Sequence, residues 1–128
     1  MDEAVSPALT PSLRLMVGRT VVIGPGKAQL LDLIRETGSI AAAGRRMGMS
    51  YKRAWSLVAT MNRSFREPLV SVSRGGSEHG GAAVTAIGES VLAAYRRLLA
   101  GIDAGTDTAL IRGALVFGAG QDGAADEG

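Results

Sequence analysis

The side chains between residues 45 and 56 are of the types that bind DNA. The cationic residues and serines of this stretch are Arg45, Arg46, Ser50, Lys52, Arg53 and Ser56. Lysine and arginine donate to guanine O6 and N7, and a serine hydroxyl bonds either way to a base edge. Both cations and helix-capping serines also bind phosphate oxygens. The stretch therefore indicates contacts to both the bases and the backbone of a duplex.

A helix-turn-helix is the element that would position these side chains. Residues 40–59 read IAAAGRRMGMSYKRAWSLVA. Ser39 and Ser50 can each cap a helix through the side-chain oxygen, and Gly48 supplies the backbone freedom that a sharp turn needs. In the second helix the apolar residues recur at steps of three and four, at Ala54, Leu57, Val58, Met61 and Phe65. Pro68 is expected to end this helix.

The polar face of the second helix is expected to meet DNA. A helical period turns the following residues away from the apolar stripe: Tyr51, Lys52, Trp55, Ser56, Ala59 and Asn62. Arg45 and Arg46, late in the preceding helix, suit backbone phosphates better than bases. Trp55 fits either packing at the rim of the interface or direct DNA contact, and Tyr51 either DNA contact or an ordinary surface position.

Positive charge is concentrated around the same motif. Residues 45–74 contain seven basic residues and one acid, a net charge of +6, whereas the whole chain carries +2. This distribution suits a polyanion-binding surface, although a solvated helical face would have the same composition.

The remaining chain completes a mainly α fold with a small β-hairpin wing, a winged helix-turn-helix. We expect a flexible leader over 1–12, the DNA-binding domain over 13–100, a candidate dimerisation extension over 101–117 and a disordered tail over 118–128. Within the domain, 13–17 and 20–24 form a hairpin through a type II′ turn at Gly18-Arg19. A helix over 27–37 stops at Gly38. Strands at 69–73 and 83–85 flank a glycine-rich wing, and a helix over 87–100 follows with Ile87, Val91, Ala94 and Leu98 on one side.

Composition argues against several other classes of protein. The chain has no cysteine, one histidine and no long apolar segment, so we expect a soluble cytoplasmic protein without membrane contact. His79 has no neighbouring cysteine or histidine to share a metal, and Glu78-His79 lacks a nucleophile. Gly24-Pro25-Gly26-Lys27 does not meet the Walker spacing. We therefore expect no enzyme activity, no metal and no cofactor.

Longer strings resemble a known family. IGPGKAQLLDLIRETGSIAAAGRRMGMSYKRAWSLVATMNRSFREPLV, followed by a GG…GG wing and AVTAIGESVLAAYRRL, is similar to the N-terminal DNA-binding domain of ModE-type molybdate-responsive transcription regulators. The string MSYKRAW followed by MN and EPLV is the specific part. The resemblance implies a LysR-like winged helix that binds DNA as a homodimer. It places contacts at Ser50, Tyr51, Lys52, Arg53, Ser56 and the 74–81 loop, which includes Arg74 and His79.

The resemblance also sets an expectation about the signal. Full-length family members carry C-terminal β-barrels that bind molybdate, but 28 residues follow Ala100 here, and we expect no molybdate binding by this chain. The leading hypothesis is a regulator of molybdate transport or molybdenum metabolism that binds a palindromic operator as a homodimer. The alternative is a truncated interaction module that heterodimerises with a full-length regulator and modulates it.

Overall fold

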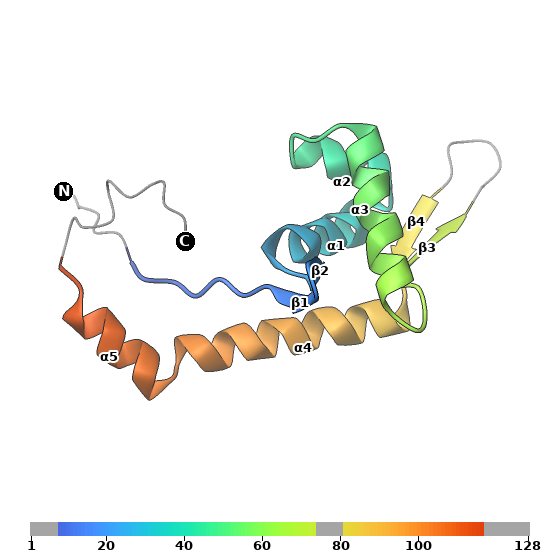
Figure 1. The fold of residues 1–128 in the computed structure, drawn as a ribbon. Coiled ribbons are helices and arrows are strands. Elements are labelled where there is room, and N and C mark those ends of the chain that lie inside the picture. Colours follow the sequence, from blue (N-terminus) through green and yellow to red (C-terminus); the bar gives the residue numbers. More distant parts are fainter. Residues whose placement is uncertain (1–7, 74–80, 117–128) are drawn as a thin grey trace. The chain divides into compact units, whose positions relative to one another are not determined.

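The computed structural model describes residues 8–73 and 81–116 (Figure 1). The described residues divide into two compact units, 12–97 and a second unit built from 8–11 and 98–116. Within the described residues, no helix is long and apolar enough to cross a membrane. The first unit contains every element of the predicted helix-turn-helix and its wing.

A short antiparallel hairpin, β1 (Leu15–Val17) and β2 (Thr20–Ile23), begins the first unit. Gly18 at its turn has a φ of 61°, whereas Arg19 does not have a positive φ. A positive φ at only the first central residue defines the predicted type II′ turn.

Three helices follow: α1 (Pro25–Thr37), α2 (Ile40–Arg46) and α3 (Tyr51–Ser64). Helix α1 begins at Pro25, earlier than predicted, because the fixed φ of proline suits the first helical position. Gly38 ends α1 with a φ of 71°. Ser39 and Ser50 cap α2 and α3, since each Oγ accepts a 3.0 Å hydrogen bond from the backbone N–H three residues on. The predicted stop and both predicted caps are confirmed.

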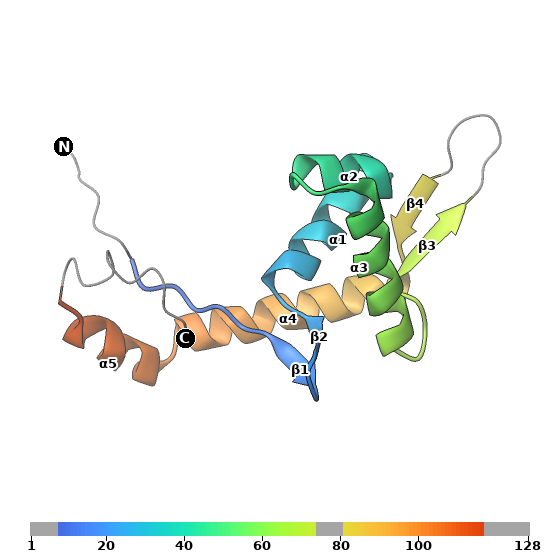
Figure 2. The same ribbon diagram turned by 45° about the horizontal axis from the view of Figure 1, so that its top comes forward.

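The turn between α2 and α3 depends on two glycines. Gly48 has a φ of 74°, a conformation that side chains disfavour. A Cβ on Gly44 would lie 2.8 Å from Cβ of Ala54, so the two helices approach more closely than a side chain at that position allows. In Figures 1 and 2, α2 lies across one end of α3 beside α1, the arrangement of a helix-turn-helix.

One apolar core joins these helices to the first half of the following helix. Its fully buried side chains include Leu30, Leu31, Ile34, Val58, Met61, Leu69 and Leu92. Of the predicted stripe on α3, Ala54 is also buried, whereas Leu57 and Phe65 are half-buried. The prediction of the core-facing side of α3 is therefore confirmed at its centre.

The wing consists of β3 (Val70–Ser73) paired antiparallel with β4 (Gly81–Val84). Helix α3 ends at Ser64, so the prediction that Pro68 ends it is wrong. Asn62 explains the early return of the chain: its Oδ1 accepts from the N–H groups of Leu69 and Val70 at 2.8 and 3.1 Å. On the other strand, the N–H of Ala82 donates to the Gly38 carbonyl at 2.9 Å, which ties the wing to the end of α1.

Helix α4 (Ala86–Asp103) does not bury the apolar side noted in the sequence as its main contact with the core. Its buried residues are Gly88, Leu92 and Tyr95, whereas the predicted stripe of Ile87, Val91, Ala94 and Leu98 is half-buried to exposed. Tyr95 belongs to the core because its hydroxyl donates to the Leu13 carbonyl at 2.8 Å. An aromatic side chain with a satisfied polar group thus forms part of the buried face of α4.

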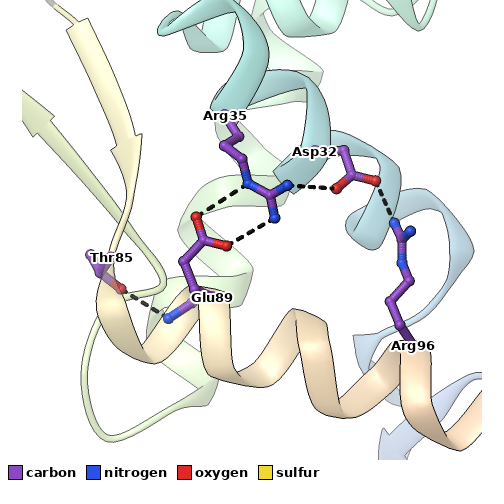
Figure 3. A network of polar contacts seen from close by, with 6 residues as sticks. Asp32, Arg35, Thr85, Glu89 and Arg96 are labelled. Atoms are coloured by element: carbon purple, nitrogen blue, oxygen red, sulfur yellow. Dashed lines mark hydrogen bonds and ion pairs between the residues drawn. The ribbon is translucent and has the colours of Figure 1, made fainter.

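Ion pairs on the surface join α1 to α4 (Figure 3). Arg35 donates to both carboxylate oxygens of Glu89, at 3.2 and 2.8 Å. Asp32 lies 3.8 Å from Arg35 and also pairs with Arg96 of α4. All four side chains are at least one-third exposed, so the network fixes the direction of α4 more than it adds stability.

The second unit contains the end of α4 and helix α5 (Thr106–Ala114). Arg112 donates to the Asp103 carboxylate at 2.7 Å and to the Leu9 carbonyl at 3.0 Å. The part of the predicted leader over 1–7 and the predicted tail over 118–128 lie outside the described residues. The order and pairing of the elements confirm a mainly α winged helix-turn-helix.

Candidate nucleic-acid interface

Four residues form the outer face of α3: Lys52, Ser56, Ala59 and Arg63, all exposed. They follow one another at steps of four, three and four, so they lie along one side of the helix. The opposite side buries Ala54, Val58 and Met61 in the core. Since α3 contains no aspartate or glutamate, the outer face presents cations and hydroxyls to solvent without a competing anion.

The first turn of α3 adds three of the predicted residues. The Ser50 oxygen accepts from the Arg53 N–H, which leaves the hydroxyl hydrogen free to donate to another group. Tyr51 is 61% exposed, and its ring meets that of Trp55 edge-on with centroids 6.1 Å apart. Arg53 is exposed on the flank of α3 that faces the start of α1.

Trp55 lies on the other flank of α3, beside the wing. It lines a hollow of about 280 Å³ whose other walls include Tyr51, Val72 and Ala82. The indole is half-buried, and its Nε1 is buried without a hydrogen-bond partner among the described residues. A buried donor without an acceptor is uncommon. The residue thus packs at the rim between α3 and the wing, and its N–H is unsatisfied there.

The two arginines at the end of α2 differ in their surroundings. The guanidinium of Arg46 lies 2.7 Å from the Glu36 carboxylate, with both side chains more than half exposed. Arg45 is exposed on the same turn. An exposed ion pair is weak and exchanges readily, so both arginines can meet an approaching phosphate.

The wing residues Arg74 and His79 lie outside the described residues, and their predicted DNA contacts stay predictions. Asn62 does not face DNA as predicted: it is half-buried, and Nδ2 also donates to the Val70 carbonyl at 3.1 Å. Its amide is therefore a structural tie between α3 and the wing.

Arg63 also lies on the outer face of α3, although it is not among the DNA-contacting residues predicted from the sequence. The prediction favoured residues in the N-terminal half of the helix. The position of Arg63 seven residues after Ser56, two turns along the same side, was the available signal.

Comparison with known proteins identifies what this region is similar to. No family model matches the chain. It is 40% identical over 72 residues to the molybdenum transport protein ModE of Azotobacter vinelandii and 32% identical over 83 residues to the DNA-binding transcriptional dual regulator ModE of Escherichia coli. The region is ModE-like.

The ModE-like region covers part of each relative. The molybdenum-pterin-binding protein MopB of Rhodobacter capsulatus is 44% identical over 80 residues, which is 62% of this chain and 30% of MopB. The two ModE proteins are matched over 27% and 32% of their lengths. The chain thus spans about three-tenths of the length of these ModE and Mop relatives.

Proposed function

We propose that this chain is a sequence-specific DNA-binding regulator of genes for molybdate transport or molybdenum metabolism. The observation that carries the proposal is the outer face of α3, with Lys52 and Arg63 at its two ends and Ser56 between them. The names of the ModE relatives support the choice of genes.

The recognition helix of a helix-turn-helix enters the major groove with its N-terminal residues closest to the bases. Lys52 then donates to guanine O6 or N7, and Ser56 bonds to the next base edge. Ser50, Arg45 and Arg46 bind backbone phosphates and set the register of the helix. Arg63, at the C-terminal end of α3, binds a phosphate on the far side of the groove.

We further propose that the chain binds its operator as a homodimer. Its second unit exposes large apolar side chains at Leu98, Ile102, Leu110, Ile111, Leu115 and Val116, with exposures between 40% and 74%. Apolar surface of this extent marks an interaction site more often than ordinary surface. A second copy of the same unit is a self-complementary partner for it, and two-fold symmetry then requires a palindromic operator.

Selection of bound duplexes from a randomised pool tests the proposal. The expected result is a palindrome whose half-sites lie about 34 Å apart, bound by two copies of the chain. A pool without a consensus would contradict sequence-specific binding. Binding only to a longer ModE-like regulator, with no DNA retained, would favour the interaction module instead. Genomic footprinting with and without molybdate then tests the proposed genes.

A further inference from the structure

A basic pocket lies on the opposite side of α3 from the wing. It has a volume of about 260 Å³ and is formed by the hairpin, the start of α1 and the flank of α3. Three of its lining residues are cationic, Arg14, Lys27 and Arg53, and none is acidic. The volume is that of several water molecules at about 30 Å³ each, enough for a phosphate group with its hydration.

Arg14 lines the pocket, and packing against Gly24 holds its side-chain stem. Its side-chain stem lies against the backbone of Gly24, because a Cβ on Gly24 would come within 3.2 Å of Cγ of Arg14. Since Gly24 has no side chain, the stem of Arg14 can approach the Gly24 backbone this closely. The guanidinium, with five donors in a planar fork, is suited to bind two oxygens of one tetrahedral anion.

Lys27 is the buried cation that lines the pocket. It is 9% exposed, and its ammonium donates to the Val21 carbonyl. An ammonium has three N–H donors, and within residues 8–73 and 81–116 the Val21 carbonyl is the one acceptor that it meets, so donors remain unused there. A buried cation is costly unless it is paired. An anion in the pocket would supply both the missing acceptor and the missing negative charge.

The start of α1 contributes backbone donors to the same pocket. Gly24 caps the helix without a side-chain hydrogen bond, and the first turn contains no acidic residue. The N–H of Gly26 therefore lies at a positive helix end with no side chain to receive it. The positive end of α1 adds to the positive charge of the three side chains. Without those side chains, the helix end alone would not define an anion site.

We propose that the pocket formed by Arg14, Lys27 and Arg53 binds a tetrahedral oxyanion of the phosphate class. Two sources have this chemistry. One is a phosphate of the DNA backbone. Arg53 lines the pocket and also lies beside the outer face of α3, so a phosphate of DNA bound to that face could reach the pocket. The other is a free inorganic anion. The DNA source rests on the proposed function, whereas the free-anion source does not.

The first arm of the test titrates the full chain with inorganic phosphate at constant ionic strength, observed by ¹H–¹⁵N NMR. We expect saturable shifts at the amides of Gly26 and Lys27. Arg14→Gln should raise the phosphate dissociation constant about tenfold, the usual loss for one charge-assisted hydrogen bond. Arg19→Gln removes the same charge from the same hairpin outside the pocket and should leave the constant unchanged.

The second arm measures DNA affinity against salt for the same variants. If the anion is a DNA phosphate, Arg14→Gln should reduce the slope of log K against log salt by about one, and Arg19→Gln should not. If phosphate causes saturable NMR shifts but the two variants have equal salt slopes for DNA binding, the pocket binds a free anion. Unsaturable shifts that are the same in both variants, together with equal slopes, overturn the proposal. A chain that binds no DNA refutes the proposed function but leaves the first arm decisive.

Discussion

The Thr85 hydroxyl and the Gly88 backbone together start helix α4. Thr85 Oγ1 accepts a 3.0 Å hydrogen bond from the Gly88 N–H and donates to the Pro68 carbonyl at 2.8 Å. A Cβ on Gly88 would lie 2.3 Å from the Leu69 carbonyl oxygen, so only glycine fits beneath this cap. Thr85 and Gly88 are the threonine and the glycine of the string AVTAIGES, and their spacing thus has a physical basis in the contact of α4 with the strand that leads into the wing.

Gly88→Ala should therefore destabilise the fold. The added methyl group meets rigid backbone, and overpacking of this kind costs about 1–3 kcal/mol. Urea unfolding followed by circular dichroism measures the change. Gly101→Ala in the same helix is the control, because nothing lies within 4 Å of its Cβ position and the substitution should stabilise by roughly 0.5–1 kcal/mol. Equal stability of the two variants would refute the steric argument.

Removal of the Asn62 amide should loosen the wing. Asn62→Ala loses three hydrogen bonds to the backbone of Leu69 and Val70 and leaves buried groups unpaired, a loss of about 1–3 kcal/mol. Hydrogen exchange at the Leu69 and Val70 amides should accelerate. Ser64→Ala, an exposed change in the last turn of the same helix, should leave both amides protected. Unchanged exchange in Asn62→Ala would show that the strand is held by other contacts.

Loss of charge at Lys52 and Arg53 together should abolish binding to the selected duplex. Both side chains are exposed, so Lys52→Gln with Arg53→Gln should leave thermal unfolding unchanged. Gel-shift titration measures affinity, and the double variant Arg19→Gln with Arg97→Gln, at two exposed arginines outside α3, controls for net charge. Full affinity in the α3 variant would place the DNA elsewhere on the molecule.

Polar substitution of the apolar surface of α5 should prevent dimerisation. Leu110 and Ile111 are 71% and 53% exposed, so Leu110→Ser with Ile111→Ser should not unfold the first unit. Analytical ultracentrifugation should show a dimer for the unchanged chain and a monomer for this variant. Asp107→Asn on the same helix should remain dimeric. A dimer that survives both changes would show that α5 is not the contact.

Burial of Lys27 predicts a pH dependence of stability. Desolvation lowers the pKa of Lys27 below the ordinary lysine value of 10.5. Between the folded pKa and 10.5 the unfolded chain binds more protons, so the free energy of unfolding rises with pH in this window. The penalty is present in full below the folded pKa and disappears above 10.5.

The variant Lys27→Met lacks this titratable group, so it serves as the reference for the unchanged chain. Urea unfolding at a series of alkaline pH values should show the unchanged chain gaining stability relative to the variant as pH rises. A constant difference between the two proteins across the window would show that Lys27 retains its ordinary affinity for protons in the folded state.

The helix-turn-helix could be predicted from the sequence because its signals are local. The Ser39 and Ser50 caps each involve a residue three positions away, and the positive φ of Gly38 and Gly48 depends on the absence of a side chain at one position. The apolar stripe of α3 needed only the helical period. Such features depend only on residues close in sequence, so they can be inferred from the residue types.

Features that join distant residues could not be predicted in this way. The early end of α3 depends on the contact of Asn62 with Leu69, and the buried face of α4 depends on the bond from Tyr95 to Leu13, 82 residues away. The GPGK segment has no recognisable phosphate-binding spacing, yet the fold brings Arg14 and Arg53 beside Lys27.

Short-range hydrogen bonds and local backbone freedom specify the helix-turn-helix, its caps and its cationic side, so these can be inferred from the residue order. Which polar side chains stay available to a ligand depends instead on long-range packing. Packing ties Asn62 to the wing, leaves Arg63 exposed on the outer face of α3 and brings three cations to the lining of one pocket. Each outcome depends on which distant part of the chain lies against the side chain.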